Sequence, residues 1–202
     1  MTIAIIVGIL ALAIAPLFWA MPSRRERQLA ALRTAARKRG FALQITEVDH
    51  PDPSAEMQVS AGGKQRRPMQ ACVAYRLQRP PTADDARSTA HSAAMERFDA
   101  ETADVRVMAR SRLERRAGLQ AAALPAGWGL AAGVLHADPA LCAWAPRFGD
   151  DVLALESTQS SAAVFWLERG GEARLAELES MLRQLMADQA AGAASAATTA
   201  PV

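Results

Sequence analysis

The strongest fold signal in this chain lies in residues 152–189, VLALESTQSSAAVFWLERGGEARLAELESMLRQLMADQ. Two apolar runs, 152–156 and 163–167, flank a short polar segment, which is the pattern of two strands joined as a β-hairpin. Residues 172–189 then carry a leucine stripe at spacings of three, four and three: Leu175, Leu178, Leu182 and Leu185. These spacings predict a helix that covers one face of the sheet. The alternative is a partner-binding zipper, although so short a stripe does not make a coiled coil.

Two further strands are expected upstream of the hairpin. Residues 41–48 alternate partway between apolar and polar side chains, and residues 71–77 form a second apolar run. The segment between them, 49–69, holds three prolines and two glycines and predicts a long loop. Because two strands alone are marginally stable, we expect this antiparallel pair to pack with other elements.

The middle of the chain gives weaker signals. Residues 82–100 are alanine-rich and charged, so they predict either a loosely held helix, which we favour, or a disordered segment. Residues 103–116 predict a weak amphipathic helix, and residues 130–135 fit a strand. Asp138-Pro139 predicts a helix start that continues to Trp144, because Asp caps helices and Pro is tolerated at the first helical position.

The N-terminal residues 2–21 are uncharged and mostly apolar. At ~1.5 Å per residue a helix of this length reaches about 30 Å, the thickness of a bilayer's hydrocarbon core, so the run predicts a membrane span. A cleaved signal peptide is the alternative, but no Lys or Arg precedes the apolar core and Pro16 follows its cleavage-like motif. Small residues share one helix face at Ala4, Gly8, Ala11 and Ala15, which indicates either a helix-packing seam or the general abundance of alanine.

A basic segment follows the predicted span and holds Arg24, Arg25, Arg27, Arg33, Arg37, Lys38 and Arg39. Positive flanks stay on the cytoplasmic side, so we expect the N-terminus outside the bacterial inner membrane and residues 22–202 in the cytoplasm. These seven side chains are predicted to contact anionic phospholipid head groups. Ser23 and Glu26 match a capping box that begins a helix, and Gly40 suits its end. This helix either lies on the lipid bilayer or packs its leucines onto the domain.

Charge is distributed unevenly along the chain. Residues 1–40 hold seven basic side chains and one acidic side chain, although the net charge of the whole chain is only +2. The remaining residues therefore carry a net charge of −4. A mildly acidic body argues against nucleic acid as the partner.

No catalytic, cofactor-binding or metal-binding constellation is visible in the sequence. The histidines, His50, His91 and His136, lie in different segments, and the densest polar cluster, 49–52, sits in a proline-rich loop. Residues 127–132 formally fit a dinucleotide-binding fingerprint but lack the strand and long helix that it requires. Cys72 and Cys142 are expected to be buried and reduced in the cytoplasm; in a periplasmic domain they could form one disulfide. We therefore predict that the chain is not an enzyme and binds no cofactor or metal.

The N-terminal region resembles a known family. The apolar run 2–21 followed by Pro22-Ser23-Arg24-Arg25-Glu26-Arg27-Gln28 is similar to the start of the small accessory subunit of the bacterial preprotein translocase, the YajC type. That family has one span with its N-terminus outside and a basic cytoplasmic segment after it. Its Gly-Asp-x-Val-Val-Thr-type segment is replaced here by residues 40–43, Gly-Phe-Ala-Leu. The resemblance implies an envelope location and association with membrane machinery, and it transfers no functional residues.

The predicted fold class is α+β: an N-terminal transmembrane helix and a basic juxtamembrane helix, then a small antiparallel sheet packed by helices. The predicted parts are a span at 1–21, the basic helix at 22–40, a cytoplasmic domain at 41–189 with flexible loops near 49–70 and 80–102, and a disordered tail at 190–202. We expect a single-span inner-membrane protein whose cytoplasmic domain binds a membrane or cytoplasmic protein. The alternatives are an accessory component of preprotein translocation and, third, a membrane-tethered enzyme.

Overall fold

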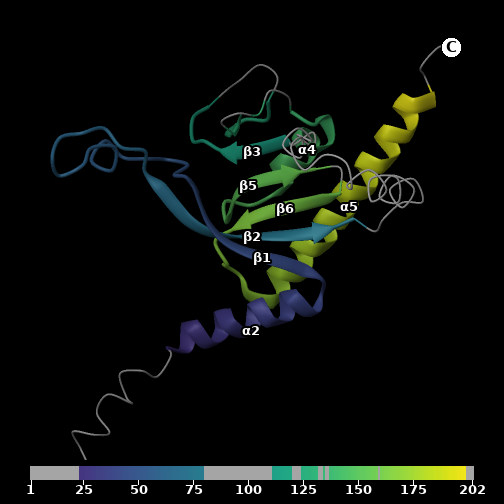
Figure 1. Cartoon of the computed structure of the whole chain (residues 1–202), viewed down its shortest axis with the longest axis horizontal. Coiled ribbons are helices and arrows are strands. Elements are labelled where there is room, and N and C mark those ends of the chain that lie inside the picture. The colour runs from purple at the N-terminus through teal and green to yellow at the C-terminus, as the bar shows by residue number, and fades with distance from the viewer. Residues whose placement is uncertain are drawn as a thin grey trace, which may run out of the picture.

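The computed structural model describes residues 23–79, 111–119, 124–131, 134, 137–158 and 160–198 (Figure 1). Their strands form one sheet in the order β1-β2-β6-β5-β3-β4, and every neighbouring pair is antiparallel. The strands are β1 (Phe41–Asp49), β2 (Met69–Gln78), β3 (Ser111–Arg115), β4 (Trp128–Leu130), β5 (Val152–Ser157) and β6 (Ser161–Trp166). The helices are α2 (Arg24–Lys38), α4 (Pro139–Trp144), the 3-10 turn η1 (Ala145–Arg147) and α5 (Gly171–Thr198).

The predicted fold class, which combined a transmembrane helix with a small sheet, is wrong. The sheet has six strands, and no helix within the described residues is both long enough and apolar enough to cross a bilayer. The longest of these helices, α5, carries charged side chains such as Glu172, Arg174 and Arg183, which are expensive to place in hydrocarbon. The predicted span at 1–21 and its helix-packing seam lie outside the described residues.

The predicted hairpin is confirmed and forms the centre of the sheet. Strands β5 and β6 pair in the register Leu155↔Val164, and all six residues of each strand are buried. Continuous burial on both faces explains why these strands are apolar runs rather than alternating ones. The predicted antiparallel pair β1–β2 is also confirmed, and it joins the centre through β2 and β6.

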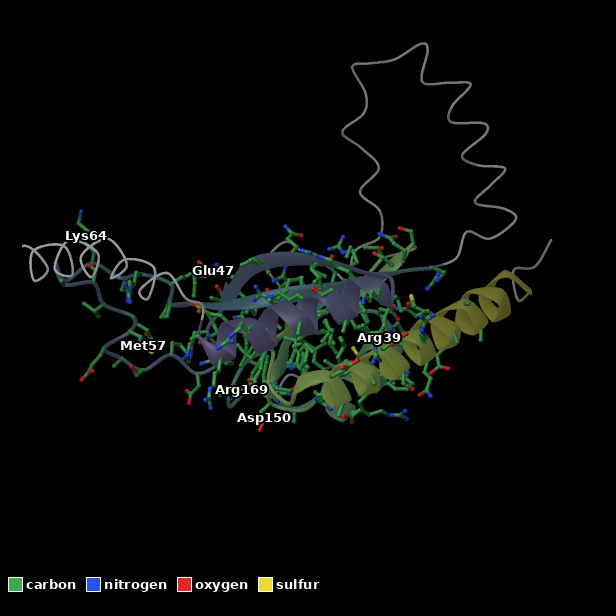
Figure 2. All side chains as sticks on the ribbon, turned by 90° about the horizontal axis from the view of Figure 1, so that it is seen from below. Arg39, Glu47, Met57, Lys64, Asp150 and Arg169 are labelled. Carbon is green, nitrogen blue, oxygen red and sulfur yellow. The ribbon has the colours of Figure 1, made fainter. Side chains whose placement is uncertain are left out.

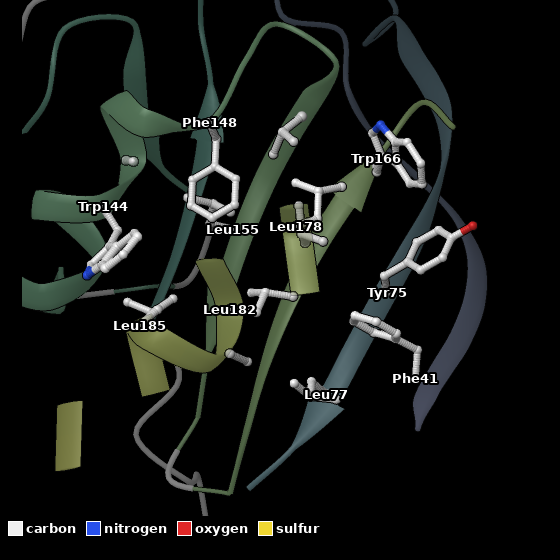
Figure 3. Packing of buried hydrophobic residues seen from close by; sticks show 14 of the residues in the cluster. Phe41, Tyr75, Leu77, Trp144, Phe148, Leu155, Trp166, Leu178, Leu182 and Leu185 are labelled. Carbon is white, nitrogen blue, oxygen red and sulfur yellow. The ribbon is translucent and has the colours of Figure 1, made fainter. Parts of the chain in front are cut away.

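Helices α2, α4 and α5 pack on one face of the sheet and close the main core. The four stripe leucines of α5 are at most 1% exposed, so the stripe is core rather than a free zipper. Phe41, Tyr75 and Trp166 line the same core from the sheet (Figure 3). Tyr75 contacts both other rings edge to face, with its ring centroid 5.8 Å from that of Phe41 and 5.3 Å from that of Trp166. Each fully buried Leu contributes roughly 1.5–3 kcal/mol, so this layer is the main source of stability.

The opposite face of the sheet combines a small apolar cluster with a row of charges. Cys72, Leu153 and Phe165 belong to the cluster, and the Arg112 guanidinium stacks over Phe165 at 4.3 Å from the ring centroid. Arg76 and Arg112 both face Glu156, with N–O separations of 2.7 and 3.8 Å. Glu156 lies opposite Ala163 of β6, as does Arg76 from the other side, so the small alanine lets the two charged side chains meet.

Strand β3 replaces the C-terminal part of the helix that the sequence predicted at 103–116; residues 103–110 lie outside the described residues. Its sequence SRLER looks helical in isolation because Arg, Leu and Glu are all good helix formers. In the fold it pairs with β5 and β4, buries Leu113 in the main core, and places Arg112 and Glu114 on the charged face. Tertiary pairing therefore overrides the local pattern.

Two other boundaries differ from the prediction, and one agrees. Helix α5 continues to Thr198, where a disordered tail was expected from 190, because alanine is the strongest helix former. Strand β4 is Trp128–Leu130, earlier than the predicted strand at 130–135. The predicted helix start at Asp138-Pro139 is confirmed: the Asp138 carboxylate accepts from the Ala140 N–H at 2.8 Å.

Strands β1 and β2 extend beyond the rest of the sheet. They pair from Phe41↔Leu77 to Asp49↔Met69, whereas β2 pairs with β6 only from Val73 to Gln78. The far end of this ribbon and its connecting loop, residues 45–72, are here called the arm (Figure 1). Figure 2 shows Met57 and Lys64 at its far end, well away from both long helices.

Candidate protein-interaction site

The exposed large hydrophobic side chains of the described chain gather on the arm or beside it. Ile45 is 75% exposed, Met69 47%, Val59 46% and Leu119 37%. The first three belong to the arm, and Leu119 follows β3 in a turn that contacts the base of the arm. The main body buries its large apolar side chains, so this concentration marks the arm as a surface with a different role.

The alternation of side chains along the ribbon explains why Ile45 and Met69 are exposed on the same face. Ile45 lies opposite Val73 and Met69 lies opposite Asp49, an even number of residues further along each strand. Phe41 and Tyr75 share that face and pack into the helix-side core. The helical cover ends before the ribbon does, which leaves Ile45 and Met69 open to solvent beside Glu47 of the same face.

The outer edge of β1 is a second available feature. Among the described strands β1 pairs only with β2, and it stands first in the strand order. An edge strand presents unpaired backbone N–H and C=O groups that an extended peptide can join. The opposite edge strand, β4, has only three residues, so β1 offers the longer edge.

A pocket of about 370 Å³ lies where the arm meets the turn after β3. The arm contributes Asp49, His50, Pro51, Pro53, Arg67 and Pro68, and the turn contributes residues 116–119. The Ala117 N–H donates to the Pro51 carbonyl at 2.8 Å, which holds the two walls together. Gly118 has φ +72°, a left-handed conformation that glycine adopts without strain, so the turn can fold back toward the arm.

Two guanidinium groups in the pocket share one carboxylate. The Asp49 Oδ2 atom lies 3.5 Å from Arg116 Nη2 and 4.0 Å from Arg67 Nη1. Arg116 Nη2 is also 3.8 Å from Glu114 Oε2, and its Nε is buried without a hydrogen-bond partner. A charged hydrogen bond is typically about 2.7–2.9 Å long, so these contacts are Coulombic and leave N–H donors unused.

The remaining polar group of the pocket, His50, accepts a backbone hydrogen bond. Its Nδ1 lies 3.2 Å from the Asp52 N–H. The described residues contain no cluster of His, Cys, Asp or Glu that could hold a metal ion. Residues 49–51 of the sequence cluster 49–52 therefore line a pocket whose chemistry is set by arginine rather than by metal ligands.

The predicted basic helix exists as α2, with both halves of its capping box between Ser23 and Glu26. Leu32 and Ala36 are buried in the main core, so α2 packs its apolar stripe onto the domain. Of the two alternatives, packing on the domain is the one observed.

The seven predicted membrane-contact residues are not equivalent. Arg33 donates two hydrogen bonds to Glu168, at 2.7 and 2.6 Å, and the Glu168 hydrogen bond raises the pKa of Arg33. Arg39 pairs with Glu172 and Glu179 on α5. The other five are exposed and include Arg24, Arg25 and Arg27 at the helix start, together with Arg37 and Lys38. The seam residues, Ala4, Gly8, Ala11 and Ala15, lie outside the described residues, as do His91 and His136.

The two cysteines lie on opposite faces of the sheet. Cys72 belongs to the small cluster on the charged face, whereas Cys142 packs against the helix-side core. Both are free thiols, and the sheet between them rules out the disulfide considered for a periplasmic domain. Burial raises the pKa of Cys72 to about 11 and also raises the pKa of Cys142, so both stay protonated at neutral pH. Protonated thiols are poor nucleophiles.

Sequence reasoning missed the pocket because its walls come from distant segments. Arg67 lies near the end of the loop between β1 and β2, and Arg116 directly follows β3. The one available signal was the density of proline at Pro51, Pro53 and Pro68, which predicted a loop but not its contact with another turn. The exposed Ile45 carried no signal at all, because it sits in an ordinary strand pattern.

Comparison with known proteins identifies no relative: no family model, curated protein or solved structure matches this chain.

Proposed function

We propose that this chain is a protein held at the bacterial inner membrane whose cytoplasmic domain binds another protein through the arm. The observation that carries the proposal is the gathering of the exposed large hydrophobic side chains on and beside the arm. Apolar side chains exposed together on one surface are typical of protein-binding sites. The adjoining edge of β1 adds backbone groups that an extended segment of the partner can pair with.

The membrane location rests on the residues at and before the start of α2. The uncharged run 2–21 directly precedes three exposed arginines, Arg24, Arg25 and Arg27. Each arginine near an anionic leaflet contributes about 1 kcal/mol of attraction. Arg33 and Arg39 are already paired with acidic groups of the domain, and Arg37 and Lys38 lie in the last turn of α2. Arg24, Arg25 and Arg27, which lie nearest the apolar run, therefore carry this contact in the proposal.

Site-specific photocrosslinking in living bacteria tests the arm. A photoreactive amino acid placed at position 45 or 69 is expected to capture one defined protein. The matched control is position 184, an exposed glutamine on the outer face of α5, which is expected to capture none. Ile45→Asp should abolish capture at position 69 while leaving the stability of the fold within about 1 kcal/mol, the span of strand propensities, because Ile45 is exposed. Equal capture at 45, 69 and 184 would contradict an arm-specific partner.

The identity of the captured protein separates two functions. A translocase subunit would favour the role in preprotein translocation that the resemblance at residues 2–28 implies. Any other membrane or cytoplasmic protein would favour an independent interaction domain. Absence of capture at both arm positions would remove the basis for either.

A further inference from the structure

The pocket at the base of the arm has the features of a receptor for a single carboxylate. Two guanidinium groups, Arg67 and Arg116, face the Asp49 carboxylate. Glu114 also lies 3.8 Å from Arg116, but it pairs more closely with Arg112, at 2.9 Å, outside the pocket lining. The pocket therefore keeps one positive charge. A carboxylate carries one negative charge and balances it. A phosphate monoester carries nearly two charges at neutral pH and would leave the site negative.

The two arginines are available for such a ligand, unlike the arginines that stabilise the fold. Arg174 donates two hydrogen bonds to Asp151 at 2.9 Å, and Arg115 donates to the carbonyls of Val152 and Phe148 at 3.0 and 2.9 Å. The closest acidic contacts of Arg67 and Arg116 are 4.0 and 3.5 Å. Guanidinium groups prefer paired hydrogen bonds to a carboxylate, which the pocket's own Asp49 does not supply at these distances.

The walls of the pocket favour a carboxylate that is carried on an apolar stem. Pro51, Pro53, Pro68 and the exposed Leu119 line it beside the arginines. Proline has no backbone N–H to donate and its ring holds φ nearly constant, so these walls are apolar and preformed. A hydrated inorganic anion has no apolar surface to bury against these walls. An acidic side chain with apolar neighbours does bury such surface there.

We propose that this pocket binds an aspartate or glutamate side chain of the partner protein, flanked by apolar residues. The carboxylate pairs with Arg67 and Arg116, and the flanking residues contact the prolines and Leu119. The inference rests on the proposed function, since it names the chemistry of the segment that docks beside the arm.

Peptide titration of the full-length protein in detergent tests the proposal. The probes are acetyl-Leu-Glu-Leu-amide, its glutamine counterpart and inorganic phosphate, with binding followed by NMR of 15N-arginine side chains. We expect the glutamate peptide to bind at least about tenfold more tightly than the glutamine peptide, because charge-assisted hydrogen bonds are lost in the second. Arg67→Gln and Arg116→Gln should each weaken binding about tenfold, while Arg183→Gln, an exposed arginine on α5, should not change it.

Three results would overturn the proposal. They are equal binding of the two peptides, phosphate binding as tight as that of the glutamate peptide, or an equal loss with Arg183→Gln. Arg67 has a 75% exposed side chain, so Arg67→Gln is expected to fold normally even if Arg116→Gln does not. If crosslinking from position 45 persists while the glutamate peptide fails to bind, the pocket inference fails and the proposed function stands.

Discussion

Asp151 joins the central hairpin to helix α5 through its side chain. Its carboxylate accepts hydrogen bonds from Trp166 Nε1 at 2.8 Å and from Arg174 Nε and Nη2 at 2.9 Å each. Its backbone carbonyl accepts from the Leu167 N–H at 2.9 Å. This single residue therefore links the start of β5, the end of β6 and the first turns of α5. Its neighbour Asp150 has a 97% exposed side chain and serves as a natural comparison.

The pKa of Asp151 predicts how stability depends on pH. Burial raises this pKa, but the hydrogen bonds and charge of Arg174, together with Trp166, outweigh burial and lower it below the usual 3.8. Because the unfolded state binds the proton more readily, the stabilisation is full above the unfolded pKa and is lost as the pH falls through the folded one. We expect stability to fall on acidification below about pH 4. Asp151→Asn should be about 1–3 kcal/mol less stable at pH 7 and lose less on acidification.

Urea unfolding of the wild type and the variants at pH 7, 5 and 3 measures this dependence. Asp150→Asn is the matched control. Asp150 also accepts a hydrogen bond from Arg115, at 3.0 Å, but its side chain is 97% exposed and solvent screens the pair, so the pH dependence is expected to follow the wild type. A wild-type pH profile in Asp151→Asn would show that other groups control acid unfolding.

At the scale of elements, helix α5 is defined by the buried face that it turns to the sheet. Leu182 is completely buried in the main core (Figure 3). Gln184, two residues further on, is exposed on the outer face of the helix. Leu182→Ala should lower the free energy of unfolding by about 2–5 kcal/mol, because it leaves a cavity in the core. Gln184→Ala should change it by at most about 0.5 kcal/mol. The two unfolding midpoints in urea check this, and equal midpoints would contradict a core role for the stripe.

Elements with strong local patterns were predictable, and those that depend on distant partners were not. The hairpin 152–167, the leucine stripe and the capping box of α2 are each encoded within a few residues, so the sequence predicted them correctly. Strand β3 is encoded by its pairing with β5 and β4, which no local pattern reveals. The extension of α5 beyond Gln189 was missed because an alanine-rich tail suits both a helix and a flexible end.

At the scale of the whole molecule, the proposed location of the domain on the cytoplasmic side of the inner membrane is open to direct measurement. We expect a reporter that is active only in the cytoplasm to give a signal when fused after Val202, because the arginines that follow residues 2–21 favour cytoplasmic retention. A fusion after Gln189 is unsuitable, because it would interrupt helix α5, which continues to Thr198. Activity of a periplasm-specific reporter instead would contradict the proposed location. A disulfide between Cys72 and Cys142 cannot serve as a second marker of the side of the membrane, because the sheet separates the two thiols.

Local sequence patterns were enough to specify the central hairpin, the face that α5 buries, the start of α2 and the uneven distribution of charge. These features depend on side-chain spacing and on residues close together in the chain. Only the tertiary structure decided that α2 packs on the domain, that a charged segment becomes β3, and that Arg67 and Arg116 meet in one pocket. It also decided that Ile45 and Met69 stay exposed, because the helices end before the β1–β2 ribbon does. Exposure is a property of what covers a side chain, and that cover comes from parts of the chain far away in sequence.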